Sequence, residues 1–304
     1  MRHVGVTDGG VEEARPAPRL SSLRRALAAA RRRPGLLVGL ALIALLAAIA
    51  LAAPWLAPHD PTHIFDEGLT DSGGPLPLGA SRFLLGTDPE GRDVLSRLVW
   101  STRTSLAIGL VAVALTAGLG ATLGAVAGFF GGWADTLIMR GADLLLAFPP
   151  ILLAMALVAA FGSGLPTIVA VVAAVTWPPL TRLVYVQVLS VRERDFVEAA
   201  RALGVGPWRL LWRHVAPQTL PLVTSYSALA VAAAVSLEAT LSFLGLGVPL
   251  DGVSWGVMIN IGGDYYRSDP PLLLLPAAAI VVCVLAFTLV GEDLRGQTGW
   301  RGSP

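Results

Sequence analysis

Long apolar stretches alternate with short polar ones along almost the whole chain. Six stretches approach the roughly 20 residues that a helix needs to cross the hydrocarbon core of a membrane. They are Pro34–Leu56, Ser105–Phe129, Leu144–Phe161, Leu165–Val186, Pro217–Gly245 and Pro271–Gly291. Arg140 and Asp143 are charged residues just before the third stretch and make its first residue hard to assign, and Glu238 interrupts the fifth. The pattern predicts an all-α, polytopic membrane protein with six transmembrane helices.

The same pattern divides the chain into five parts. An N-terminal arm (1–33) precedes the first span (34–56), and a polar segment (57–104) separates it from a core of five helices (105–291) that ends in a short tail (292–304). The first stretch begins after 33 residues, and its apolar core is longer than the 7–15 residues of a signal peptide. We therefore read it as a retained span.

The positions of the arginines predict the orientation in the membrane. All 22 basic residues are Arg, and 17 of them fall in the arm, near residue 140, in and around 187–216, or in the tail. The other five lie in 57–104 and 246–270. Cytoplasmic loops carry the excess of basic residues. We expect both termini and the loop 187–216 to be cytoplasmic, and the segments 57–104 and 246–270 to face outward.

The composition supports a membrane protein and argues against nucleotide-binding and metal-binding sites in this chain. Only 14% of the residues are charged and 54% are hydrophobic, with a mean hydropathy of +0.68, whereas a soluble domain carries about 25% charged residues. The absence of Lys excludes a G-x-x-x-x-G-K-[ST] phosphate loop. Two His four residues apart, His59 and His63, form a weak zinc signal without a third ligand. We expect no catalytic site, no metal site and no binding of nucleic acid.

Small residues and prolines mark two features within the spans. Gly120, Gly124 and Gly128 stand four residues apart, so one helix face could approach a neighbour closely. We interpret this face as ordinary packing, with a moving contact as the alternative. The prolines in Phe148–Pro150 and Trp177–Pro179 break helical hydrogen bonding and predict kinks in the third and fourth spans.

The loop 187–216 interrupts the apolar pattern with two short amphipathic helices. The apolar residues repeat at i, i+3, i+4 and i+7 in each: Phe196, Ala199, Ala200 and Leu203, then Trp208, Leu211, Trp212 and Val215. Gly204 sits where a helix C-terminus takes a left-handed residue, and Pro207 suits the first position of a helix. Pro217 is then expected to open the fifth span.

Two interpretations of this loop stay open on physical grounds alone. A basic amphipathic pair could lie on the lipid headgroups. It could instead dock a cytoplasmic partner. Ala199 and Ala200 favour docking slightly, because they leave a shallow face that another protein can approach.

The stretch VEAARALGVGPWRLLWRHVAP resembles the EAA loop of ABC importer permeases. Further stretches resemble the dipeptide, oligopeptide and nickel permeases within that family: LLGTDPEGRDVLSRLVWSTRTSL (84–106), GFFGGWADTLIMRGADLLLAFP (128–149), EATLSFLGLGVPLDGVSWGVMI (238–259) and LAFTLVGEDLRGQ (285–297). APWLAPHDP (53–61) is typical of the C-type subunit. The resemblance implies an ATPase-coupling site at Glu198, Ala199, Ala200, Arg201, Gly204 and Pro217. The loop 187–216 is therefore called the coupling loop below.

The resemblance also implies a function and a set of partners. The chain would be a multi-pass permease subunit of an ATP-driven importer in the bacterial inner membrane. It would form half of the pathway for peptides brought by an external solute-binding protein, beside a paralogous B-type permease. Two cytoplasmic ATPase subunits would bind ATP and Mg, so this chain itself needs no cofactor. Nickel or another small solute is an alternative cargo, and a secondary transporter or channel without ATPase partners is the rival class.

Five charged residues have two interpretations each. Glu198 contacts the ATPase or caps its own loop. Glu238 lines the pathway or hydrogen-bonds within the bundle, since carboxylates inside a membrane are costly and often functional. Asp88, Arg92 and Asp93 face the binding protein or pair with one another.

Overall fold

A computed structural model describes residues 33–80 and 82–297 of the chain, and within them it shows helices and no β-strand. The helices are α2 (Pro34–Leu56), α3 (Val94–Phe130), α4 (Gly132–Leu146), α5 (Pro150–Phe161), α6 (Leu165–Arg192), α7 (Asp195–Ala202), α8 (Pro207–Leu210), α9 (Leu220–Phe243), α10 (Trp255–Gly263) and α11 (Pro271–Gln297). The expectations for the arm and for the end of the tail fall outside the described residues.

The all-α, membrane-spanning class is confirmed. Five helical runs are long and apolar enough to cross a membrane: α2, α3, α6, the run Pro207–Phe243 and α11. The sixth expected span is a pair, because α4 and α5 meet at 95°. The break expected at Phe148–Pro150 is confirmed, but it separates two helices, so the prediction of one continuous span over Leu144–Phe161 was wrong. Pro149 and Pro150 each lack an amide hydrogen, and Pro149 has an extended ψ of 128°, so the helix ends before them and a new one begins.

Other boundaries also differ from those expected. The second span starts at Val94 rather than Ser105, because the Asp93 carboxylate accepts the Ser96 amide at 2.9 Å and caps the helix there. The fourth span continues through Trp177–Pro179 to Arg192 as one helix. The segment between α2 and α3 is thus 57–93, called the α2–α3 segment below. The expected loop 246–270 contains the nine-residue helix α10.

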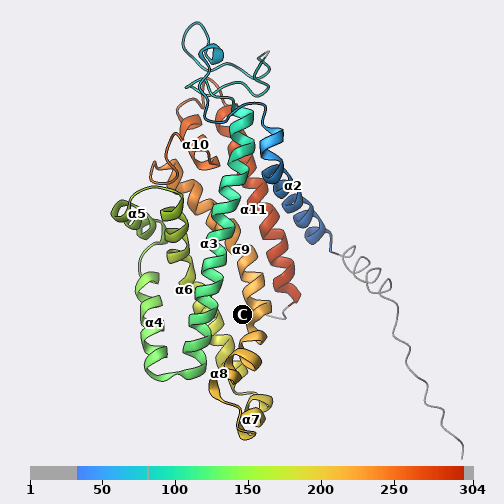
Figure 1. The fold of residues 1–304 in the computed structure, drawn as a ribbon, viewed down its shortest axis with the longest axis vertical. Helices are drawn as coiled ribbons and strands as arrows, with labels where there is room; N and C mark the ends of the chain where they lie inside the picture. Colours follow the sequence, from blue (N-terminus) through green and yellow to red (C-terminus); the bar gives the residue numbers. More distant parts are fainter. Residues whose placement is uncertain (1–32, 81, 298–304) are drawn as a thin grey trace, which may run out of the picture.

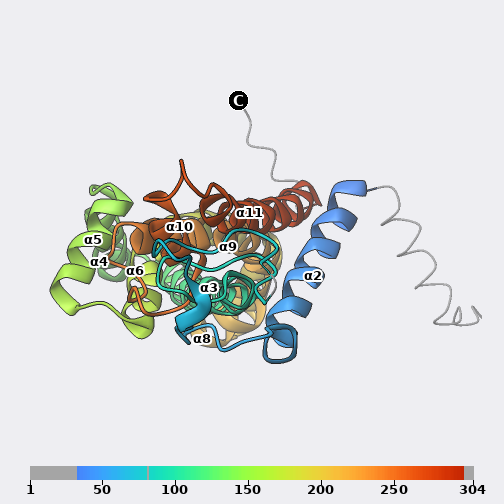
Figure 2. The same cartoon turned by 90° about the horizontal axis from the view of Figure 1, so that it is seen from above.

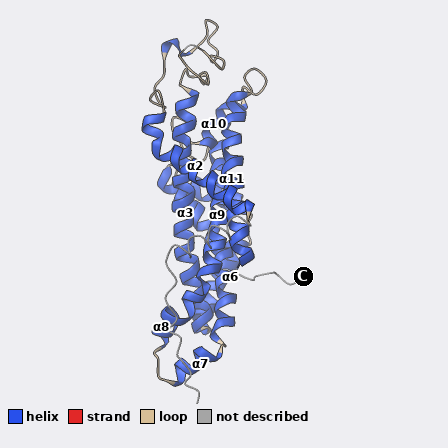
Figure 3. Ribbon diagram, turned by 90° about the vertical axis from the view of Figure 1, so that its right-hand side faces the viewer, coloured by secondary structure: helices blue, strands red, loops and turns tan. Residues whose placement is uncertain are grey.

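Helix α3 lies at the centre of the bundle, in contact with α2, α6, α9, α10 and α11. Figure 1 shows it running along most of the bundle, from the α2–α3 segment at one end toward α7 at the other. Seen from above, α4 and α5 lie on one side of α3 and α2 on the opposite side (Figure 2). The loops gather at the two ends (Figure 3).

The glycine face of α3 packs directly on α6. A Cβ atom at Gly120 would lie 3.1 Å from the Leu180 side chain, and one at Gly128 would lie 2.9 Å from the Tyr185 carbonyl oxygen. At Gly124 the Thr181 carbonyl oxygen would be only 2.5 Å away. Because Gly124 and Gly128 cannot hold a larger residue without displacing the α6 backbone, these two glycines fix the distance between the helices.

Candidate functional site

The coupling loop turns at a glycine, as its sequence predicts. Helix α7 ends at Ala202, and Gly204 follows with φ = +80°, in the left-handed region that favours glycine. The Gly204 amide donates to the Arg201 carbonyl at 3.0 Å, and the Val205 amide donates to the Ala200 carbonyl at 3.2 Å. This pair of bonds is the Schellman motif, which satisfies carbonyls that a helix end leaves free.

Beyond the turn, the second helix of the loop is continuous with the fifth span. Pro207 occupies its first turn, as expected. The helical path then passes through a π-turn (Leu211–Val215) and a 3₁₀-turn (Ala216–Thr219) into α9. Pro217 lies inside this run and does not open the span. Because Pro217 has no amide hydrogen, regular α-helical bonding cannot pass through it, and the π- and 3₁₀-turns accommodate the break.

A small apolar cluster anchors the loop to the ends of α3 and α6. Val197 of α7 is fully buried, as are Leu211 and Val215. They pack against Phe129 of α3 and against a row of apolar residues on α6: Leu180, Val184, Val188 and Val191. Arg192 adds a polar tie, because its guanidinium donates to the Gly128 carbonyl at 3.1 Å. The loop therefore sits on a firm base formed by two spans.

Most of the predicted apolar face of α7 points away from this base, although Ala200 packs against it. Leu203 is 85% exposed and Phe196 is 40% exposed, while Ala199 is exposed and Ala200 half-buried. Trp208 beyond the turn is 58% exposed. The side chain that holds α7 in place is Val197, which falls outside the predicted repeat. The repeat therefore marks a surface with little cover from its own chain.

The charges of α7 are also unengaged within the chain. Glu198 and Arg201 are exposed. Among the described residues neither side chain has a hydrogen-bond or ion-pair partner, and α7 has no side-chain cap. The geometry thus gives no support to Glu198 as a cap of its own loop. An exposed apolar strip with charged residues beside it has the apolar centre and polar rim that are typical of a protein–protein interface.

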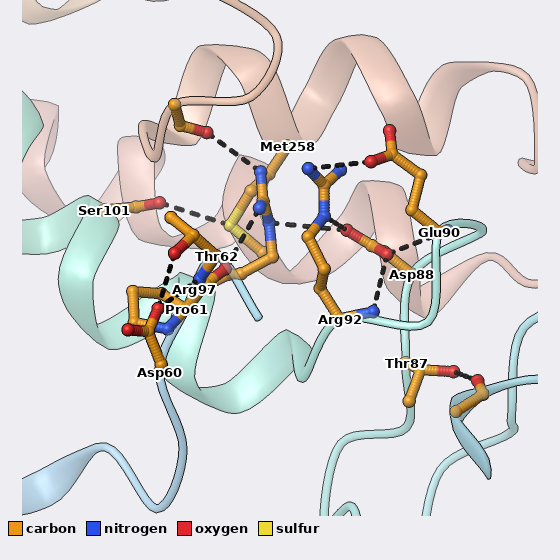
Figure 4. Close-up of polar contacts among 12 residues, drawn as sticks. Asp60, Pro61, Thr62, Thr87, Asp88, Glu90, Arg92, Arg97, Ser101 and Met258 are labelled. Carbon is orange, nitrogen blue, oxygen red and sulfur yellow. Dashed lines mark hydrogen bonds and ion pairs between the residues drawn. The ribbon is translucent and has the colours of Figure 1, made fainter. Parts of the chain in front are cut away.

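At the other end of the bundle, the three predicted charged residues are buried and contact their own chain; Figure 4 shows two of them, Asp88 and Arg92. The Arg92 Nε donates to the Asp88 Oδ2 at 2.7 Å, and Asp93 caps α3. These contacts favour the interpretation in which the residues order the α2–α3 segment. In the same segment, hydrogen bonds from the Thr62 hydroxyl and amide hold the pKa of Asp60 below its usual value.

Glu238 is fully buried where α3, α9 and α10 meet. Its carboxylate accepts the Ser242 hydroxyl at 2.8 Å and the Ser105 hydroxyl of α3 at 3.3 Å. The Ser105 oxygen in turn accepts the Trp255 amide at the start of α10, also at 3.3 Å. Glu238 lies five residues before the end of α9. These contacts place it in a polar junction within the bundle and favour its structural interpretation.

Sequence reasoning missed Arg97, the second-largest of the fully buried side chains. It was counted only for its charge, yet it contacts two segments that lie far from it in the sequence. A signal was present: Arg97, Ser101 and Ser105 are polar residues spaced i, i+4, i+8 at the start of α3. Within the described part of the chain, no three His, Cys, Asp or Glu side chains form a group that could hold a metal.

Comparison with known proteins identifies relatives over most of the chain. Residues 120–294 match the family model of the binding-protein-dependent transport system inner membrane component. Residues 21–73 match that of the N-terminal TM domain of oligopeptide transport permease C. A glutathione transport system permease protein, GsiD of Pectobacterium atrosepticum, is 38% identical over 83% of this chain and 82% of its own length.

Two further comparisons agree with these matches. A di/tripeptide transport system permease protein, DppC of Pseudomonas aeruginosa, is 41% identical over 86% of each chain. Among solved structures, a chain of the inward-facing MetNI methionine ABC transporter matches with a TM-score of 0.53 and 16% identity. That match covers 66% of this chain and 95% of the other, and at this identity it concerns the fold alone.

Proposed function

This chain belongs to the family of binding-protein-dependent transport system inner membrane components, and we propose that it forms one half of the pathway of an ATP-driven peptide importer. Its relatives include permeases named for glutathione and for di- and tripeptides, all small peptides. We infer that peptides are the cargo class, delivered by an external solute-binding protein. The other half of the pathway would be a paralogous B-type permease.

The uncovered face of α7 is the observation that carries this proposal. Exposed Leu203 and Ala199 offer an apolar strip, and Glu198 and Arg201 offer free charges beside it. We propose that this face docks into a cleft on a cytoplasmic ATPase subunit, which binds ATP and Mg. The alternative, a helix lying flat on lipid headgroups, would normally use larger apolar residues than alanine.

The base of the coupling loop would carry the movement of the ATPase into the membrane. α7 follows α6 directly, and the loop continues through α8 into α9. Since Val197 and Leu211 are locked against α3 and α6, a displaced α7 would move these helices rather than slide over them. The Gly204 turn would set the angle at which the force is applied.

The proposed orientation places the coupling loop and both ends of the described chain in the cytoplasm. Most of the arginines lie on that side of the sequence pattern. Arg33, just before α2, contacts Asp293 near the end of α11 at 2.9 Å, so the two ends of the described chain share one side. The α2–α3 segment would then face outward, toward the binding protein. Asp88, Arg92 and Asp93 would support that surface from within.

The partner subunits can be tested by affinity purification of this chain from its native membrane. The wild type is expected to recover a second permease and ATPase subunits. Leu203→Asp places a charge on the docking face and should lose the ATPase while keeping the second permease. Leu84→Asp is the matched control, since Leu84 is 73% exposed but lies in the α2–α3 segment.

Two results would overturn the proposal. One is a wild-type chain that purifies alone and stable, without an ATPase. In that case ion and solute flux through the isolated chain would test the rival class, a secondary transporter or channel. The other is equal loss of the ATPase from Leu203→Asp and Leu84→Asp, which would remove the docking role from α7.

A further inference from the structure

We infer that Arg97 is a positioning residue that holds the α2–α3 segment and the loop between α9 and α10 in one fixed arrangement on the end of α3. The inference about geometry stands on the contacts below. Its functional consequence, a preformed surface for the binding protein, rests on the proposed function.

The guanidinium of Arg97 reaches two segments at once. Nη1 donates to the Pro61 carbonyl at 3.1 Å, and Nη2 donates to the Gly252 carbonyl at 3.0 Å. The side chain is only 1% exposed, so water does not compete for these bonds. Among the described residues no hydrogen bond runs directly between the α2–α3 segment and the loop 244–254. Arg97 supplies the polar link between them.

A balanced set of charges allows this arginine to be buried. The Arg97 Nε lies 3.5 Å from the Asp88 Oδ2, which also accepts the Arg92 Nε at 2.7 Å. Glu90 contacts the Arg92 Nη1 at 2.9 Å. Two acids therefore face two guanidinium groups (Figure 4). Buried charges persist in proteins when they are paired and hydrogen-bonded in this way.

The same face of α3 also holds the start of α10. Ser101, one turn after Arg97, contacts the Met258 sulfur at 3.3 Å, and Ser105 accepts the Trp255 amide at 3.3 Å. The loop 244–254 is thus fixed by Arg97 at Gly252 and by Ser105 at the residue that begins α10. On the other side, the His59 amide donates to the Ser96 hydroxyl at 3.0 Å. The α2–α3 segment and the loop 244–254 are therefore both held in fixed positions against the first three turns of α3.

The chemistry of the side chain explains why arginine stands here. Its donors lie in a rigid planar fork, so one residue can satisfy two carbonyls that approach from different directions. A lysine is a point charge on a flexible stem and would keep one of the two bonds at a time. Substitution by Lys should therefore weaken the arrangement partly, and substitution by Gln should release it.

Spin labels can measure this arrangement directly in the assembled transporter in nanodiscs. Ile64 lies in the α2–α3 segment and Leu250 in the loop 244–254. Their side chains are 57% and 52% exposed, so both positions suit replacement by labelled cysteines. The native Cys283 is buried and would be replaced by alanine. The wild type should give a narrow distance distribution, and Arg97→Gln a broad one. Arg103→Gln is the matched control, because Arg103 lies on the same helix, exposed, over the Trp100 ring.

An equally narrow distribution in Arg97→Gln would overturn the inference. If Arg97→Gln fails to assemble, Arg97→Lys replaces it, with partial broadening expected and a wild-type distribution contradicting the inference. ATPase stimulation by increasing binding protein gives the functional readout. Arg97→Lys should need several-fold more binding protein for half-maximal stimulation, with unchanged maximal turnover. A wild type that binding protein does not stimulate would count against the proposed function, while the label distances would still decide the geometry.

Discussion

Replacing Gly124 with alanine should destabilise the protein, because the new methyl group would enter the backbone of α6. A Cβ atom there would lie 2.5 Å from the Thr181 carbonyl oxygen, 2.9 Å from the Val184 Cβ and 3.1 Å from the Tyr185 amide nitrogen. The first and third of these atoms belong to the backbone, so no rotation of a side chain can clear the space. α3 and α6 would have to separate.

The change in the free energy of unfolding is the sum of two opposing contributions, the packing cost and the helix propensity. Overpacking a close contact costs about 1–3 kcal/mol, whereas alanine is about 1 kcal/mol more favourable than glycine inside a helix. Gly118 lies on the same helix, and nothing stands within 4 Å of a Cβ atom placed there. Gly118→Ala therefore shows the propensity term alone and should be neutral or stabilising. The difference between the two variants should be the packing cost, about 1–3 kcal/mol.

Cys283 provides the assay, since it is the single cysteine of the chain and is fully buried. Membranes would be heated stepwise with a maleimide, and modification of the Cys283 peptide followed by mass spectrometry. Gly124→Ala should expose this thiol at a lower temperature than the wild type, and Gly118→Ala at the same or a higher one. Equal curves for the two variants would refute the close contact between α3 and α6.

Two further substitutions test the coupling loop and the polar junction. Gly204→Ala meets no neighbour within 4 Å but forces a side chain into φ = +80°, so it should strain the turn by about 1–2 kcal/mol and lower ATPase retention in a pull-down. Gly204→Asn should retain more ATPase, because Asn tolerates this conformation; equal retention would contradict the role of the turn. Glu238→Gln can accept from one of the two serine hydroxyls and donate its amide to the other, so it should preserve stability. Glu238→Leu should lower the free energy of unfolding by about 1–3 kcal/mol, seen as exposure of Cys283 at a lower temperature. Loss of peptide uptake by a fully stable Glu238→Gln would instead support the pathway interpretation.

Local chemistry allowed much of the fold to be predicted from the sequence. The apolar stretches indicated the spans, and the Gly204 and Pro207 pair indicated a turn that the structure contains, because backbone conformation restricts which residues fit there. The prolines after Phe148 signalled a break. They did not signal an angle of 95°, which depends on how α4 packs on α6 through contacts such as Tyr185 with Asp135.

The contacts of Arg97 could not be predicted in the same way. Its acceptors are the backbone carbonyls of Pro61 and Gly252, and every residue has such a carbonyl. α10 was missed because its nine residues are too few to stand out as a span. For α7, the periodicity identified an apolar face, but burial depends on what covers a face. Only the structure shows that Val197 is the anchor and that Leu203 is exposed.

The central claim is that α7 contacts an ATPase subunit, and site-specific photo-crosslinking tests it most directly. A photoreactive amino acid would replace the exposed Ala199 in the assembled transporter in native membranes, with exposed Leu84 of the α2–α3 segment as the control position. The account predicts a crosslink from position 199 to an ATPase subunit and none to that subunit from position 84. Crosslinks from position 199 to lipid alone would contradict it and would favour a loop that rests on the membrane surface.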